Sequence, residues 1–133
     1  MSPTTPAGTF TLPDPATVEA MSAEDVVRYC AEQFPGRVAL ACSFQKEESV
    51  LLDLLFRSDP KARVFAIDTH YLFPETYDLW RSVEQRYDTK VEVFEGPSAE
   101  ELEATHGPAL WETKPELYLS IAKVAPLNRA LAE

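Results

Sequence analysis

The stretch "RVALACSFQKEESVLLDLL", from Arg37 to Leu55, decides the fold. Its first six residues form a short, β-prone and largely apolar run, which is typical of a strand covered on both faces. From Lys46 onward, apolar residues recur every three or four positions and predict an amphipathic helix over 46–58. Between the two elements lies a polar junction, Ser43–Gln45, that contains no glycine.

The same alternation of strand and helix continues downstream. "RVFAID" (Arg63–Asp68) predicts a second buried strand, and "KVEVFE" (Lys90–Glu95) predicts a third strand with one wetter face or a sheet edge. A helix beginning at Pro74, a favoured first position, separates them. Crossovers of about twenty residues fit helical connections between parallel strands. The sequence therefore predicts a three-layer α/β domain with a parallel sheet.

Outside this unit the signals are local. Residues 1–15 carry four prolines and one glycine and predict a loose leader, which leaves 16–133 as the domain. Ser22 caps a predicted helix over 22–34, and Ser98 opens a second helix with a capping box. The last third is helical, and prolines, at 108, 115 and 126, are expected to divide it.

Composition limits the possible functions. The chain has 133 residues, enough for one modest domain. Its formal net charge of −10 argues against general binding of nucleic acid. The negative net charge does not exclude a local pocket for a small anion.

The first basic residue of the chain is Arg28, and no apolar run approaches a membrane span, so a cytoplasmic protein is expected. Cys30 and Cys42 have no metal-binding spacing and are expected to be reduced.

Two strand ends could carry chemistry, because ligands of open parallel sheets lie beyond the carboxyl ends of the strands. At the first, free amides of a helix start suit a phosphate or sulfate, Ser43 adds a hydroxyl and Lys46 a cation. The alternative is that Ser43 only caps the helix and Lys46 is solvated. Glu47 and Glu48 fit either interpretation and are not assigned as an acid/base pair.

The second strand end is Asp68–Thr69–His70. An acid in this position often meets a ribose hydroxyl, and His70 could contact a phosphate or a base. The alternative is an aspartate that bonds its own backbone in a turn.

Lys123 and Arg129 are further cations that could bind an anion, although their spacing equally fits weak surface ion pairs. The aromatic residues Tyr77, Trp80 and Tyr87 are expected in the core.

Three segments resemble one family. "SFQKEESVLLDLL", "DTHYLFPETYDLW" and "KVAPLNRAL" are similar, in this order and spacing, to the assimilatory phosphoadenylyl-sulfate and adenylyl-sulfate reductases. The resemblance runs from about Val38 to Leu131. It implies an adenine nucleotide α-hydrolase-like (PP-loop-like) fold. It also implies reduction of an adenylated sulfate to sulfite, in which a C-terminal cysteine attacks the sulfur and thioredoxin or glutaredoxin releases sulfite.

The resemblance places Ser43, Phe44 and Gln45 in the phosphosulfate loop, Asp68 and Thr69 near the nucleoside, and Lys123 at the sulfate or phosphate. With the two junctions, the predicted substrate-binding residues are Ser43, Phe44, Gln45, Lys46, Asp68, Thr69, His70 and Lys123.

The sequence departs from the family at two internal positions. His70 stands where the family usually has glycine, so it should narrow the pocket or require a left-handed backbone. Tyr118 and Leu119 stand where the adenylyl-sulfate branch has the paired cysteines of a [4Fe–4S] cluster. Neither side chain can replace a thiolate, so no cofactor is expected and the chain resembles the cluster-free phosphoadenylyl-sulfate branch.

The third departure concerns length. The family continues well beyond Glu133, with an arginine-rich segment and a terminal Glu-Cys-Gly motif, so a truncated, inactive fragment is expected, with no catalytic residue of its own. Neither Cys30 nor Cys42 lies on a mobile tail that would make it a substitute nucleophile. The strand over 37–42 would then be an exposed apolar edge that promotes self-association.

Two other functions stay open. An ATP-using relative, such as a sulfate adenylyltransferase subunit, would favour a Ser-Gly-Gly loop, whereas Phe44 and Gln45 fill those places here. A non-enzymatic nucleotide-binding or interaction module would show no turnover, or no affinity for an adenylated sulfate at all.

Overall fold

The structure is a computed structural model that describes residues 13–133. The elements, in chain order, are α1 (Pro15–Glu19), α2 (Ala23–Gln33), β1 (Ala39–Ala41), α3 (Lys46–Ser58), β2 (Arg63–Asp68), α4 (Pro74–Arg86), β3 (Glu92–Glu95), α5 (Ala99–His106), α6 (Leu110–Thr113), α7 (Pro115–Leu119), the π-helix η1 (Ser120–Val124) and α8 (Ala125–Ala132). Most of the predicted leader over 1–15 lies outside the described residues. Pro15 already begins α1, which the sequence did not predict.

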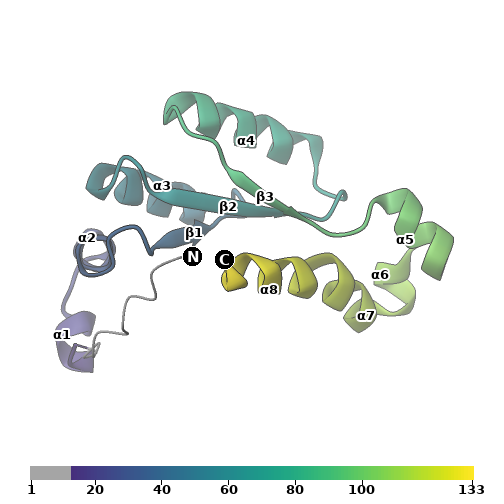
Figure 1. Ribbon diagram of the computed structural model, residues 1–133, viewed down its shortest axis with the longest axis horizontal. Coiled ribbons are helices and arrows are strands. Elements are labelled where there is room, and N and C mark those ends of the chain that lie inside the picture. Colours follow the sequence, from purple (N-terminus) through teal and green to yellow (C-terminus); the bar gives the residue numbers. More distant parts are fainter. Residues whose placement is uncertain (1–12) are drawn as a thin grey trace, which may run out of the picture.

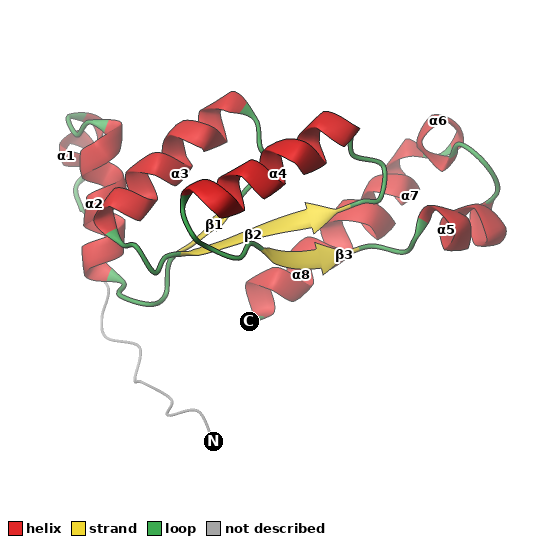
Figure 2. Cartoon of the chain, turned by 90° about the horizontal axis from the view of Figure 1, so that it is seen from above, coloured by secondary structure: helices red, strands yellow, loops and turns green. Residues whose placement is uncertain are grey.

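The three strands form one parallel sheet in the order β1-β2-β3. Helices α3 and α4 lie over one face, and α8 lies along the other face, in contact with β2 and β3 (Figure 1). Helices α5, α6 and α7 lie beyond the carboxyl ends of the strands (Figure 2). The predicted three-layer architecture with a parallel sheet is confirmed.

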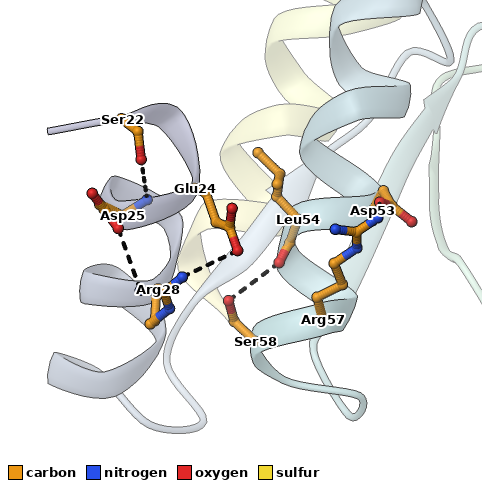
Figure 3. Close-up of polar contacts among 8 residues, drawn as sticks. All are labelled: Ser22, Glu24, Asp25, Arg28, Asp53, Leu54, Arg57 and Ser58. Carbon is orange, nitrogen blue, oxygen red and sulfur yellow. Dashed lines mark hydrogen bonds and ion pairs between the residues drawn. The ribbon is translucent and has the colours of Figure 1, made fainter.

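The helix starts follow the capping signals. The Ser22 hydroxyl accepts a hydrogen bond from the Asp25 amide, and Arg28 bridges Glu24 and Asp25 one turn later (Figure 3). Ser98 and Glu101 form the predicted capping box of α5, and Pro74 opens α4. Local chemistry at these positions agrees with the tertiary fold, which is why these helix starts could be predicted.

The core lies between the sheet and the helices α3 and α4. Leu52 of α3 is 1% exposed, as is Val64 of β2. Trp80 is buried and stacks on Phe44, with ring centroids 5.2 Å apart. Tyr77 and Tyr87 pack against this cluster while partly buried, as predicted for core aromatics.

The prediction that the first strand is covered on both faces is wrong. Ala39 and Ala41 are exposed, and only Leu40 between them is partly buried. The reason is the position of α8, which covers β2 and β3 and leaves this face of β1 open. β1 is an edge strand, which confirms the expectation that the strand over 37–42 lies at a sheet edge. β3 is the other edge, as its alternating pattern indicated.

The predicted break at Pro126 is also wrong. α7, η1 and α8 run on without interruption, and every residue at their junctions has right-handed helical angles. A proline inside an α-helix lacks one N–H and collides with the carbonyl four residues earlier. The wider π-helical turn immediately before α8 accommodates the proline, which is itself buried.

Gly96 follows β3 and lies against the π-helix. A Cβ at this position would lie 3.2 Å from both the Cα and the carbonyl oxygen of Ala122.

Within residues 13–133, no helix combines the length and apolar character that crossing a membrane requires.

Replacing Gly96 by alanine should therefore push the π-helix outward. We expect a loss of about 1–2 kcal/mol in the free energy of unfolding, in the range of overpacked sites. Gly36→Ala is the contrasting variant, since nothing lies within 4 Å of its Cβ position and only its positive φ is strained. Urea denaturation measures both variants. An unchanged free energy of unfolding in Gly96→Ala would contradict the close contact with Ala122.

Candidate functional site

A cavity of about 250 Å³ opens at the carboxyl edge of the sheet. Its walls come from the ends of β1 and β2, the start of α3, the loop after β2, and the segment η1–α8. The lining residues are Ala41, Cys42, Ser43, Phe44, Glu48, Phe65, Ala66, Ile67, Thr69, Leu72, Lys123 and Leu127. Four of the predicted substrate-binding residues, Ser43, Phe44, Thr69 and Lys123, are therefore brought together.

The junction after β1 holds its shape through Phe44. This residue has φ of 62°, in the left-handed region, and its ring is buried against Trp80 of α4. A left-handed backbone is costly for a bulky residue, and here the buried aromatic stack offsets that cost. With Phe44 turned inward, the neighbouring Ser43 is left exposed at the cavity.

Glu48 occupies the place where an anion was expected. The Ser43 hydroxyl lies 2.8 Å from both carboxylate oxygens of Glu48, and the backbone N–H of Gln45 donates to the same carboxylate at 2.9 Å. The proposal that Ser43 merely caps the helix is wrong, because the N-cap of α3 is Gln45. An internal carboxylate thus holds the hydroxyl and one amide that an external anion would use. Glu48 was expected to fit either interpretation of the junction, and this contact was not predicted.

Cys42 also lines the cavity but is a poor nucleophile. Burial raises the pKa of its thiol above the ordinary value, and the Glu48 carboxylate adds to this, against an opposing hydrogen bond from the Phe44 backbone. The thiolate, which is the reactive form, is therefore disfavoured.

The π-helix presents Lys123 to the cavity. Lys123 lies in η1, and Leu127, four residues later in α8, lines the same cavity. Pi-helical turns occur frequently at functional sites, where they re-aim a side chain. The lysine is exposed, and no described residue forms an ion pair with it, so its charge is available to an anion.

The second junction makes a tight turn. The Asp68 carboxylate accepts from the His70 amide at 2.8 Å and from the Tyr77 hydroxyl at 2.7 Å. His70 has φ of 65°, the left-handed conformation that was one of the two expected results of a histidine at this position. Burial, reinforced by the Asp68 bond, raises the pKa of Tyr77 to about 12, so its phenol stays a donor at neutral pH. The turn bond that was the alternative for Asp68 is present.

The remaining predicted residues lie elsewhere. Gln45 and Lys46 are exposed at the start of α3 and do not line the cavity. Asp68 faces a second hollow, of about 300 Å³, which Tyr77, Trp80 and Glu95 also line.

Arg129 donates to the carbonyl of Glu95 and so does not face the first cavity. The hydrophobic lining residues Leu72 and Leu127 carry no polar chemistry that could have identified them.

The residues at the cluster position do not fit an iron–sulfur centre. Tyr118 packs edge-on against Tyr71 and Trp111, with ring centroids 6.1 Å away in each case, and Leu119 is exposed. A phenol and an alkyl chain supply no thiolate, and the chain has two cysteines, neither in this segment.

The fold and the cavity define a class of protein. A parallel α/β sheet with helices on both faces, and a ligand-sized hollow at the carboxyl edge, is the arrangement of PP-loop-like domains. The family model of the phosphoadenosine phosphosulfate reductase domain matches residues 37–133. The chain belongs to this family.

Similar proteins agree with this assignment. An adenosine 5′-phosphosulfate reductase of Bacillus anthracis is 34% identical over 116 residues, which cover 86% of this chain and 51% of that protein. A Bacillus mycoides protein of the same name is also 34% identical, over 86% of this chain and 50% of its own length. The crystal structure of phosphoadenylyl-sulfate reductase from Candida auris, in a phosphate complex, superposes with a TM-score of 0.79 at 30% identity. It covers 92% of this chain and 64% of that one. The chain spans about half the length of the curated relatives it matches.

Proposed function

We propose that this chain supplies the substrate pocket of a reductase that converts an adenylated sulfate to sulfite. The observation that carries the proposal is the convergence of Ser43, Thr69 and Lys123 on one cavity at the carboxyl edge of the sheet. Hydroxyls and a lysine are suitable donors for a sulfate or phosphate group. The membership of the family and the names of the similar proteins supply the reaction class.

The phosphosulfate end of the substrate lies between Ser43 and Lys123 in this proposal. The nucleoside extends toward the turn at Asp68–His70, where a carboxylate can accept from a ribose hydroxyl. Apolar walls such as Phe65 and Leu72 suit an adenine base and exclude water from the charged end.

The chemistry we propose has two balanced steps. A cysteine thiolate attacks the sulfate sulfur, the S–O bond to the nucleotide breaks, and the nucleotide leaves with the electron pair. The enzyme S–S bond that has formed is then reduced by a dithiol protein of the thioredoxin or glutaredoxin kind, which is oxidised to its disulfide and releases sulfite.

The attacking thiolate is neither Cys42 nor Cys30 in this proposal. The Cys42 thiol has a raised pKa, and Cys30 lines a different, apolar hollow between α2, β1 and α3. The nucleophile comes from outside these 133 residues. The polypeptide alone should therefore release no sulfite when thioredoxin and an adenylated sulfate are added, and turnover by it would overturn this assignment.

Calorimetry with adenosine 3′,5′-bisphosphate tests the pocket separately from the chemistry. Saturable binding of one ligand per chain supports the proposal, and absence of binding to this ligand and to adenosine 5′-monophosphate contradicts it and favours an interaction module. Magnesium-dependent binding of ATP in preference to both would instead favour the ATP-using relatives, whose loop differs at Phe44 and Gln45.

Glu48→Gln should strengthen this binding. The substitution removes the negative charge that holds the Ser43 hydroxyl and the Gln45 amide, and so removes repulsion of the incoming anion. We expect an increase in affinity of about tenfold, equivalent to about 1.4 kcal/mol. Glu47→Gln is the matched control, because it removes the same charge from the same turn and Glu47 does not line the cavity. An equal gain in both variants would indicate a general effect of net charge.

A further inference from the structure

Three potential metal ligands converge beside the cavity, at the carboxyl edge of the sheet. One ligand atom from each of Asp68, His70 and Glu95 lies within 4.8 Å of the other two. Asp68 ends β2 and Glu95 ends β3, and the two are paired in the parallel register. Their carboxylates therefore project from neighbouring strand ends at the same level.

The left-handed turn brings the imidazole to the two carboxylates. His70 follows the strand by two residues and has φ of 65°, and its amide is tied to Asp68. A glycine would adopt this conformation without strain, whereas histidine adopts it at a cost. The backbone strain does not itself identify a ligand, but this turn places the imidazole of His70 next to the two acids.

The ionic partners of the two carboxylates bear on what the cluster could bind. Among the described residues, neither Asp68 nor Glu95 forms an ion pair. The guanidinium of Arg129 bonds the main-chain carbonyl of Glu95 rather than its carboxylate. Arg81 and Lys90 line the adjoining hollow without pairing with either acid. Two like charges this close repel each other, and a cation between them would relieve the repulsion.

Supporting contacts resemble those of metal-binding carboxylates. The Tyr77 hydroxyl and the His70 amide both donate to Oδ1 of Asp68, and no described residue donates to Oδ2. One oxygen is thus held by the protein and the other is free, which is the arrangement by which outer contacts orient a ligating carboxylate.

We propose that Asp68, His70 and Glu95 form a binding site for one divalent transition-metal ion of the zinc type. One imidazole and two carboxylates favour such an ion over calcium or magnesium, which prefer oxygen ligands alone. Ligand atoms around a tetrahedral ion with bonds of about 2.1 Å lie about 3.4 Å apart, so small side-chain rotations suffice. The three protein ligands leave a coordination position for water. In the nucleotide-free protein the ion takes the Asp68 oxygen that the proposed function offers to a ribose hydroxyl, so the site does not rest on the proposed reductase activity.

Cobalt(II) is the probe, because it substitutes for zinc and has a visible spectrum. The purified protein, without an affinity tag and in a buffer free of phosphate and chelators, is titrated with cobalt chloride at pH 7.5. Calorimetry is expected to give one ion per chain. The spectrum should show ligand-field bands without the thiolate charge-transfer band that coordination by Cys30 or Cys42 would produce.

His70→Gly is the decisive variant, because glycine accepts the left-handed turn while the imidazole is lost. We expect its affinity for cobalt to fall more than tenfold. His106→Gln is the matched control, since it removes the chain's other histidine, which is exposed on α5, and should bind cobalt like the unmodified protein. Glu95→Gln, at an exposed position, should also weaken binding about tenfold without affecting folding.

Three results would overturn the proposal. These are no saturable cobalt binding, equal affinity in His70→Gly and the unmodified protein, or a thiolate band in the spectrum. None of them depends on nucleotide binding, so the metal site and the proposed function can fail independently.

Discussion

Truncating Leu52 to alanine is expected to lower the free energy of unfolding by about 3 kcal/mol, within the range for fully buried leucines. Leu52 is 1% exposed and lies on the face of α3 that packs onto the sheet, among Val64, Trp80 and Val83 of the same core cluster. The substitution removes apolar contacts and leaves a cavity that these neighbours can only partly fill.

Leu51→Ala provides the comparison for this measurement. The preceding residue on the same helix is 36% exposed, so the same loss of volume should cost about 1 kcal/mol or less. Urea denaturation followed by circular dichroism gives both values. Equal losses in the two variants would mean that α3 does not pack as the structure has it.

Replacing Lys123 by alanine is expected to weaken binding of adenosine 3′,5′-bisphosphate between about tenfold and a hundredfold, the range for a hydrogen bond to a charged group. The lysine lines the same cavity as Ser43 and is the single lysine or arginine among the lining residues. Binding should also lose part of its salt dependence, because one charge pair with the ligand is gone.

Lys61→Ala is the matched control for this second prediction. Lys61 is exposed just before β2, at the amino edge of the sheet and so at the end opposite the cavity. It removes the same charge and should leave the affinity unchanged. A similar loss in both variants would assign the effect to the overall charge of the protein, and not to a contact in the cavity.

The helix and strand bounds that could be predicted are those with a strong local signal. α3 and β2 have the predicted limits, because an apolar period of 3.6 and a continuous β-prone run are properties of the residues themselves. The two wrong predictions about the fold depend on tertiary context. Whether β1 is covered depends on where α8 packs, and whether Pro126 ends a helix depends on the turn before it.

At the candidate site, too, some features could be predicted from the sequence and others depend on the tertiary structure. The junctions at Ser43 and Thr69 could be predicted from their place after strands, since parallel strands bring such residues to one edge. The contact between Ser43 and Glu48 could not, because both the bond and its absence fit the same sequence spacing. The resemblance to the reductases located Lys123, whereas its spacing from Arg129 left several partners open.

The π-helical turn makes the number of residues between 120 and 124 matter more than their identity. In an α-helix each residue advances the direction of a side chain by about 100°. Deleting one residue here would turn α7 by that angle relative to α8, so that Tyr118 could no longer meet Tyr71 and Trp111 while Leu127 still faced the cavity. Proteins of this family with a single-residue gap in this segment should have a differently arranged aromatic cluster, however similar their sequences are on either side.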